Sequence, residues 1–488
     1  MNPLTPVLVG VSQILERGFE PDAVREPIDL MLTAAKAAAE DSQSSDILSA
    51  IDSVRVVRGI WRYKQPAGYL AEALGLDKPE LVGTPFGGNS VQALVSQTAL
   101  DILAGEIEVA LVVGAEVGNS QAKLAKRGQT MTYRETEGPY DKMLGEEVPM
   151  SCEAEKARGV AQPIQMYPMF ENAIRHARGE SIADHRNRIA KLWSGFSAVA
   201  AQNPTAWIQK EVSPEEIKTA SASNRMVSFP YPKLMNSNSA VDMGAALLMT
   251  SVEKARALGI PESQWVYPWS GANAHDTYAV SNRANLHSSP AIRHAGNKAL
   301  ALAGVTVSQL DRVDVYSCFP SAVQVAVAEL GLDDTKPLTI TGGLTFGGGP
   351  LNNYVMHSIA KMVELSRLHP SEIGLITANG GYLTKHAFGV YSGTAPVQDF
   401  QFEDVQDAVD AEPTRTVLDD YDGPATVESY TVMYGAEGPK MGHLVCLTPA
   451  GERVWANIED PAEWVAMTES ETCGRAVMVD GTGAARFV

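Results

Sequence analysis

One stretch of the chain decides its fold: Phe86-Gly87-Gly88-Asn89-Ser90-Val91-Gln92-Ala93-Leu94. An apolar segment leads into it, and the pattern predicts a helix that begins here and ends near Ala104-Gly105. The apolar run from Val109 to Glu116 then predicts a buried strand. Gly87-Gly88 suits a plain strand-to-helix turn because glycine leaves the backbone free. The same turn also places backbone N–H groups at a helix start, where they can bind a carbonyl or an anion.

The composition indicates a globular protein of more than one domain. The chain has 488 residues, of which 45% are hydrophobic and 20% charged. No apolar run reaches the roughly 18 residues of a membrane span, and the start lacks the features of a signal peptide. We therefore expect a cytoplasmic protein. The net charge of −19 argues against nucleic acid and anionic membranes as partners.

The cysteines do not form a recognisable metal or disulfide motif. There are four of them, without a Cys-x-x-Cys pair, namely Cys152, Cys318, Cys446 and Cys473. A chain of this length with four cysteines fits a reducing compartment. We expect no bound metal.

The order of patterns along the chain predicts a layered α/β fold. A helix is expected over Pro27 to Glu40 and a strand over Ser53 to Val57. A later helix at Pro290 to Ala303, a strand at Val313 to Tyr316 and a helix at Ala322 to Leu330 repeat the plan of the first part. Between these parts, residues 119–235 have few strand-like runs, and the last ~80 residues alternate in short runs typical of a small β barrel.

Several segments resemble thiolases, the Claisen-condensing enzymes that act on acyl-coenzyme A. Their nucleophile turn reads Cys-Gly-Ser-Gly-Leu-Arg-Ala, and Gly87 stands where its cysteine would be. Asn236 to Leu247 resembles the thiolase segment that returns the chain to the N-terminal half. Tyr167 to Asn172 resembles part of the loop domain that covers the pantetheine arm. With its added C-terminal part, the chain is similar to the thiolase-like protein type 1 group.

This resemblance implies a duplicated thiolase fold of five layers, αβαβα, with a loop domain and a small OB-like β domain at the C-terminus. The implied division assigns 1–118 with 236–255 to the N-terminal half, 119–235 to the loop domain, 256–398 to the C-terminal half, 399–420 to a linker and 421–488 to the OB-like domain. The acidic surroundings of that last domain favour a structural or interaction role over nucleic-acid binding. Thiolases pair through the strand after the nucleophile helix, so we expect a homodimer rather than a monomer.

Thiolase chemistry needs a thiolate, a base, a second acid/base and an oxyanion hole. The resemblance places the nucleophile at Gly87, next to Gly88, and the activating base at Gly349 within Gly342 to Pro350. Neither glycine can act as nucleophile or base. The second acid/base cysteine corresponds to Ala378, next to Asn379, which also reads as a simple turn residue.

The oxyanion element corresponds to Tyr316-Ser317-Cys318-Phe319. Tyr316 can still donate its O–H. Cys318 is the one thiol left at a thiolase site position, and it is read either as a catalytic group or as a small buried hydrophobe. His386 is its candidate partner if the following turn folds inward, although a lone histidine is more often structural.

Three hypotheses for function follow. The first is a thiolase-like protein that binds an acyl-coenzyme A ester or a lipid-like ligand without ordinary thiolysis. The second is an acyltransferase that uses Cys318, with His386 or Tyr316. The third is a non-enzymatic partner of an active thiolase. The sequence assigns no residues to coenzyme A.

Overall fold

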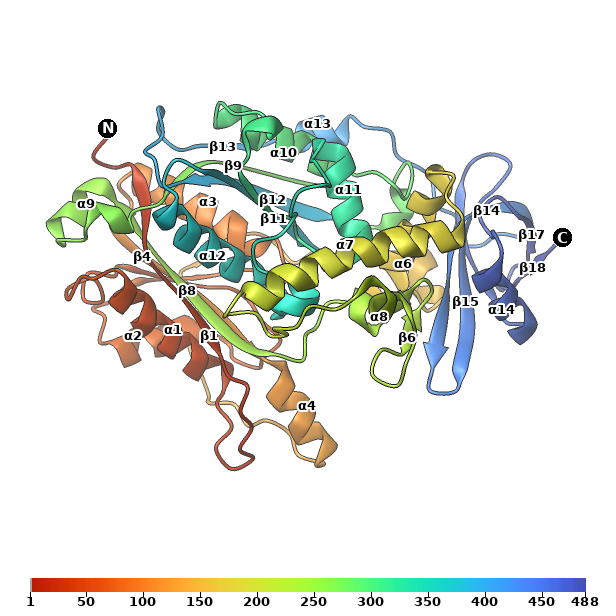
Figure 1. Ribbon diagram of the computed structural model, residues 1–488, viewed down its shortest axis with the longest axis horizontal. Helices are drawn as coiled ribbons and strands as arrows, with labels where there is room; N and C mark the ends of the chain where they lie inside the picture. The colour runs from red at the N-terminus through yellow and green to blue at the C-terminus, as the bar shows by residue number, and fades with distance from the viewer. Residues whose placement is uncertain (1) are drawn as a thin grey trace.

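The computed structural model describes residues 2–488 and is built around three sheets (Figure 1). The first has six strands, in the order β1 (Pro6–Leu15), β8 (Asp242–Ser251), β4 (Val109–Val117), β2 (Ser53–Val56), β3 (Glu80–Gly83) and β5 (Lys142–Met143). The second has five, in the order β10 (Arg312–Asp314), β11 (Ile373–Gly380), β12 (Lys385–Ser392), β9 (Tyr267–His275) and β13 (Gln401–Asp404).

Helices cover both sheets and separate them. One outer layer holds α1 (Pro27–Asp41) and α2 (Pro66–Leu74), which pack on the first sheet. The middle layer holds α3 (Ser90–Leu103) and α12 (Tyr354–Leu368), each in contact with strands of both sheets. The other outer layer holds α10 (Pro290–Leu302) and its neighbour α11 (Pro320–Leu330). The predicted five-layer αβαβα fold is therefore confirmed.

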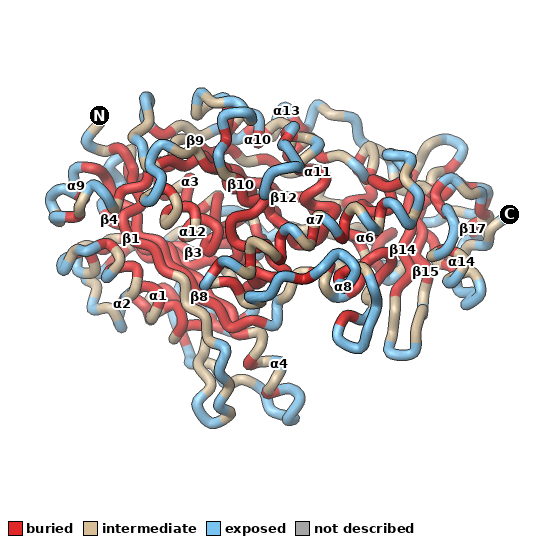
Figure 2. The backbone as a smooth tube through the Cα atoms, in the orientation of Figure 1, coloured by how far each residue is buried: buried red, intermediate tan, exposed pale blue. Residues whose placement is uncertain are grey.

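Local sequence explains where the elements begin. Glu26 and Asp29 form a reciprocal capping box at the start of α1, and Pro27 occupies its first turn. The alanine-rich face of this helix is buried against the first sheet. All nine residues of β4 are buried, as expected for a central strand covered on both faces. Figure 2 shows this buried interior running through the sheets.

The segment between the two halves contains mostly helices. They are α4 (Gly118–Lys126), α5 (Glu153–Ala157), α6 (Pro163–Ala177), α7 (Ile182–Gln202) and α8 (Pro214–Lys218). The short strands β6 (Met226–Ser228) and β7 (Tyr231–Pro232) follow, and β6 pairs with β14 of the third sheet. Two further helices lie outside this segment, α9 (Val252–Ala257) and α13 (Gln406–Asp410). None of the helices within residues 2–488 has the length and apolarity of a membrane span.

The C-terminal sheet contains β16 (Arg453–Ile458), β15 (Gly438–Leu447), β14 (Gly423–Gly435), β17 (Ala476–Val479) and β18 (Ala485–Phe487), in that order. It has its own hydrophobic core and is joined by α14 (Pro461–Glu469). A parallel bridge between Asn457 and Ala484 brings the two ends of the sheet together. The sheet therefore curls toward a small barrel, in agreement with the predicted C-terminal β domain.

Two expectations from sequence differ from the structure. β4, the strand after the nucleophile-turn helix, lies between β8 and β2, so both of its edges are already paired. The prediction of a dimer that forms through this strand is therefore wrong. Residues 399–420 are more than a linker: β13 pairs with β9 at the edge of the second sheet, and α13 packs on α10. Strand pairing across the fold, which short-range patterns do not reveal, decides both cases.

Candidate functional site

The turn before α3 lies against the end of β11 and against Tyr316. A Cβ atom added at Gly88 would collide with the Tyr316 hydroxyl and with the carbonyl oxygen of Asn379. A Cβ added at Gly380 would collide with the side chain of Asn89 and lie 3.2 Å from the nitrogen of Gly88. These glycines are therefore needed for close backbone approach rather than for a special φ angle.

The glycine-rich segment from Gly342 to Pro350 contacts the segment that carries Tyr316 and Ser317. Ser317 Oγ accepts a hydrogen bond from the backbone nitrogen of Leu344 at 3.3 Å. Gly349 lies against Ser237 and the carbonyl oxygens of Leu344 and Asn238, and these atoms leave no space for a side chain. The structure thus groups the segments that carry Gly88, Tyr316, Asn379 and Gly349, although they are far apart in the sequence.

Lys385 occupies the space where a side chain at position 87 would be. A Cβ atom added to Gly87 would lie 3.0 Å from Lys385 Nζ and 2.5 Å from Asn89 Oδ1. Lys385 Nζ donates a hydrogen bond of 2.9 Å to the carbonyl oxygen of Phe86. Burial lowers the pKa of Lys385, while the nearby Glu147 carboxylate opposes this shift. Sequence reasoning missed Lys385 because it lies almost 300 positions further along the chain.

Cys318 is buried beside Tyr167 and Asn379. Its side chain is 8% exposed, and Asn379 Nδ2 lies 3.8 Å from its Sγ atom. The same Asn379 nitrogen donates to the Tyr167 hydroxyl at 3.0 Å. Burial raises the pKa of the Cys318 thiol to about 12, although contacts with Tyr167 and Asn379 work in the opposite direction. Because the thiolate is the nucleophile, Cys318 is poorly activated in this conformation.

His386 lies near these residues but has other partners. It is paired with Asn379 across β11 and β12. Its Nε2 atom is 3.2 Å from the carbonyl oxygen of Leu383 and 3.7 Å from Asp276 Oδ2. Asp276 in turn accepts a hydrogen bond from Ser289 at 2.5 Å. Within residues 2–488, no hydrogen bond connects His386 with Cys318, so the proposed pair is not formed in this conformation.

The space around these residues is small. One cavity has a volume of about 10 Å³, close to the space that one water molecule needs. Its wall includes Tyr316, Ala378, Asn379 and His386. An acyl chain does not fit there unless surrounding side chains move.

A larger groove lies between the start of α6 and the β14–β15 hairpin, with a volume of about 460 Å³. Ile164, Met433 and Met441 contribute apolar surface, and Lys440 contributes a positive charge. The groove also contains His443, whose Nδ1 atom is 2.8 Å from Asn457 Oδ1. On its wall, Ala161 accepts a hydrogen bond of 2.5 Å from the hydroxyl of Tyr382, which follows the Asn379 segment.

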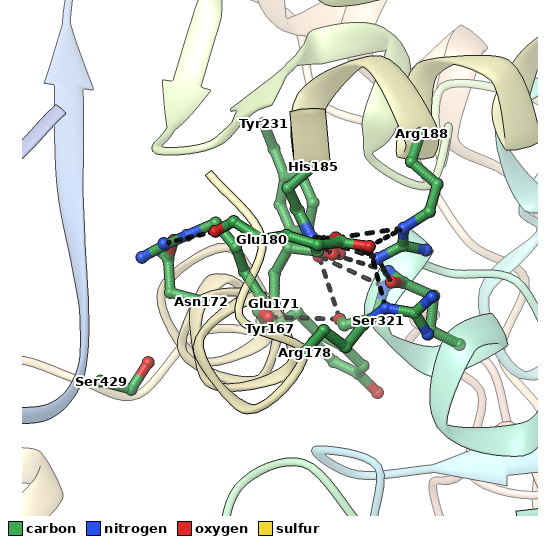
Figure 3. Close-up of polar contacts among 12 residues, drawn as sticks. Tyr167, Glu171, Asn172, Arg178, Glu180, His185, Arg188, Tyr231, Ser321 and Ser429 are labelled. Carbon is green, nitrogen blue, oxygen red and sulfur yellow. Dashed lines mark hydrogen bonds and ion pairs between the residues drawn. The ribbon is translucent and has the colours of Figure 1, made fainter. Parts of the chain in front are cut away.

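A buried polar network that the sequence analysis did not predict holds α6, α7 and α11 together (Figure 3). Glu171 on α6 accepts hydrogen bonds from Tyr231 at 2.5 Å and Gln324 at 2.6 Å, and lies 2.5 Å from His185 Nε2. Burial alone raises the pKa of Glu171, but the His185 contact and the other donors hold it below its usual value. Tyr231 also donates to Ser321 at 3.0 Å.

This network reaches both the Cys318 turn and the C-terminal domain. Ser321 lies three residues after Cys318, at the start of α11. On another side of α6, Asn172 donates to the carbonyl oxygen of Tyr430 at 2.9 Å, and Ser429 donates to that of Met169 at 2.5 Å. The only sequence signal was a set of polar residues within an otherwise apolar helix, which does not identify their partners.

One group of side chains offers metal-binding atoms, His176, Glu471 and Cys473. Glu471 already binds Arg175 through both carboxylate oxygens, at 2.6 and 2.7 Å. Burial raises the pKa of the Cys473 thiol beyond the usual range. The adjacent guanidinium and the protonated thiol both disfavour a cation at this position.

Comparisons with known proteins agree with this architecture. Residues 404–484 match the family model described as the thiolase-like protein type 1 additional C-terminal domain. An acetyl-CoA acetyltransferase from Methanothermobacter thermautotrophicus is 26% identical over 266 residues, which cover 51% of this chain and 65% of the relative. This chain therefore spans slightly less than two thirds of that relative's length.

Two solved structures show the extent of the likeness. A monomeric SCP2-thiolase like protein type 1 from Mycobacterium smegmatis is 34% identical, with a TM-score of 0.86 and coverage of 100% of both chains. The dimeric peroxisomal thiolase of Saccharomyces cerevisiae is 15% identical, with a TM-score of 0.58, and the match covers 80% of this chain and 98% of the thiolase. The latter likeness concerns the fold alone.

Proposed function

The chain belongs to the SCP2-thiolase-like protein type 1 family, and from this membership we propose that it binds an acyl-coenzyme A ester or a lipid-like molecule without ordinary thiolysis. The absence of a side chain at Gly87 supports the proposal that ordinary thiolysis does not occur, because glycine cannot act as the nucleophile and the side chains of Asn89 and Lys385 border this position. The thiol of Cys318 is buried and carries a raised pKa. Nucleophilic catalysis by a thiol requires an accessible thiolate.

The groove of about 460 Å³ between α6 and the β14–β15 hairpin is the observation that carries the binding proposal. Its volume falls within the range of small-molecule sites. Ile164, Met433 and Met441 suit an acyl chain, and Lys440 suits an anionic group. The cavity beside Asn379 is far too small for such a ligand. We therefore assign the ligand to the groove.

The binding test uses the full chain with acetyl-coenzyme A, acetoacetyl-coenzyme A and a non-reactive thioether analogue. We expect thermal stabilisation by the analogue, since a ligand at 100 times its Kd adds about 2.7 kcal/mol to the free energy of unfolding. Replacing Lys440 with Glu reverses the charge at the groove and should weaken binding about tenfold or more. Lys336→Glu alters an exposed lysine outside the groove and should leave binding unchanged.

The same samples distinguish the alternatives. Intact mass after incubation with the two thioesters should show no acyl adduct. An adduct that disappears in Cys318→Ala would instead establish the acyltransferase alternative. If millimolar analogue produces neither stabilisation nor a binding isotherm, the ligand-binding proposal is wrong and the non-enzymatic partner alternative gains support.

A further inference from the structure

The amine of Lys385 is placed as a nucleophile at the turn before α3. Lys385 begins β12 and pairs with Gly380 at the end of β11, which fixes the start of its side chain beside the turn. Its Nζ atom lies 3.0 Å from the position of a Cβ atom at Gly87. Any larger residue at position 87 would compete with the amine for this space. The two positions are therefore spatially coupled.

The surroundings of Nζ suit carbonyl chemistry. Nζ donates a hydrogen bond to the carbonyl oxygen of Phe86, and because Phe86 is exposed and Lys385 only partly buried, solvent can reach this end of the turn. Asn89 Oδ1 is buried without a hydrogen-bond partner. Among the described residues, the backbone nitrogens of Gly88 and Asn89 also have no hydrogen-bond acceptor, and they stand at the start of the 14-residue α3.

The electrostatic setting favours the neutral amine. Desolvation lowers the pKa of Lys385, and the positive end of the α3 dipole also disfavours an ammonium ion. The Glu147 carboxylate opposes this shift, and it accepts a hydrogen bond of 2.7 Å from the backbone nitrogen of Phe86. A neutral lysine amine is the form that attacks carbonyl carbon.

We propose that Lys385 forms Schiff bases with small aldehydes or ketones at the turn formed by Phe86, Gly87 and Asn89. The nitrogen lone pair attacks the carbonyl carbon, and the carbonyl oxygen takes up a proton as the carbinolamine forms. The amine nitrogen gives up its two protons, one to this oxygen as the carbinolamine forms and one as the oxygen leaves as water and the C=N bond forms, so the step needs no oxidant or reductant. The free N–H groups before α3 can donate to the oxygen as its negative charge develops.

This activity goes beyond the proposed ligand binding and does not depend on it. The groove residue Lys440 does not line the Gly87 turn. Lys440→Glu should therefore leave the Lys385 reaction unchanged even where it abolishes ligand binding. Loss of one function without the other separates the two proposals.

The test treats the full chain with limiting propanal and sodium cyanoborohydride near neutral pH. Cyanoborohydride supplies the hydride that converts each C=N bond into a stable secondary amine. Peptide mapping then gives a modification rate for each lysine. We expect Lys385 to react several-fold faster than exposed Lys336, because its amine lies at the helix start in a position that favours the neutral, nucleophilic form.

Two variants sharpen this measurement. Lys385→Met removes the amine and keeps an unbranched side chain that is one atom shorter, and it should eliminate the fast-forming adduct. Lys336→Met should leave that adduct intact. The wild-type comparison of Lys385 with Lys336 decides the question even if Lys385→Met fails to fold. A Lys385 rate equal to or below that of Lys336 would overturn the proposal.

Discussion

At the scale of single residues, small side chains decide how closely the site segments approach. Gly88 brings its backbone against Tyr316 and Asn379, and Gly87 leaves room for the amine of Lys385. Gly349 packs against Ser237 and backbone oxygens in the same way. At each of these three positions, neighbouring atoms lie within or close to the space that a side chain would need. The backbone segments therefore pack closely at Gly88 and Gly349, while Phe86, Asn89 and Lys385 remain at least partly exposed beside them.

Replacing Gly88 with alanine should destabilise the protein by about 1–3 kcal/mol, the usual range for overpacking a filled interior. The added methyl group would collide with the Tyr316 hydroxyl and with backbone at Asn379, and backbone cannot move aside cheaply. Urea unfolding followed by circular dichroism measures this change.

Gly195→Ala is the matched control. Gly195 lies inside α7, and an added Cβ atom would meet nothing within 4 Å. Alanine should therefore stabilise the chain by about 0.5–1 kcal/mol through its higher helix propensity. Equal stability effects of the two substitutions would contradict the packing explanation for Gly88.

At the scale of elements, α6 joins the two-sheet α/β core to the C-terminal domain. One side carries Glu171, which joins the network of α7 and α11. Another side carries Asn172 and Arg175, which bind Tyr430 and Glu471 of the C-terminal domain. The groove lies at the start of this helix. A change in the docking of α6 would therefore affect the groove and the Cys318 turn together.

Arg175→Met should loosen the C-terminal domain and reduce the free energy of unfolding by about 2 kcal/mol, as for hydrogen bonds between charged groups. Arg175 is buried and holds both carboxylate oxygens of Glu471, which is 44% exposed. Hydrogen exchange should increase in the segment from Thr472 to Val479, and urea unfolding should report the overall loss.

Arg178→Met provides the comparison at the end of the same helix. Its ion pair with Glu180 is at the surface, with the arginine side chain 50% exposed. Surface pairs contribute about 0–1 kcal/mol, so this variant should remain close to the wild type. An Arg175 variant as stable as the Arg178 variant would show that the Arg175–Glu471 pair does not hold the domains together.

At the scale of the whole molecule, β3, the strand that precedes the turn at Gly87, is not an unpaired edge strand of the first sheet. β3 pairs with β2 on one side and with the short β5 on the other. β4, through which we expected a dimer to form, is enclosed by β8 and β2. Pairing of either strand with a second copy would require breaking existing hydrogen bonds.

We therefore propose a monomer and expect a solution mass near 52.2 kDa. Light scattering coupled to size-exclusion chromatography should give this value across a hundredfold range of protein concentration. Sedimentation velocity at the highest concentration provides an independent measurement. A mass that rises toward two chains with concentration would contradict the monomer.

Much of the core could be predicted because its signals are local. The helix expected over Pro27 to Glu40 is observed as α1, Pro27–Asp41. The strand expected from Val109 to Glu116 is β4, Val109–Val117. Hydrophobic periodicity and glycine turns act within a few residues, so a single chain displays them directly. The repeated order of these elements predicted a layered α/β fold, and the resemblance to thiolases implied its five layers.

The candidate site was less predictable because its contacts are long-range. The sequence suggested a Cys318–His386 pair, but His386 contacts Leu383 and Asp276 in this conformation. The catalytic role predicted for Cys318 and the pocket predicted at the thiolase positions stay predictions. The acidic segment from Asp399 onward looked like a linker, yet its β13 pairs with β9. Nothing near that segment in the sequence identifies its partner strand.

The sequence by itself determined the layered fold, the added C-terminal domain and the absence of a side chain at Gly87, because each depends on residue identity and local spacing. Only the tertiary structure decided that Lys385 fills the vacant space, that Glu171 joins three helices and that β4 is enclosed. These outcomes depend on which distant segments meet when the apolar surfaces are buried. Local hydrophobic patterns decide which faces of the helices and strands are buried, and this burial specifies the layers. The few polar contacts between the layers depend instead on how the complete chain packs.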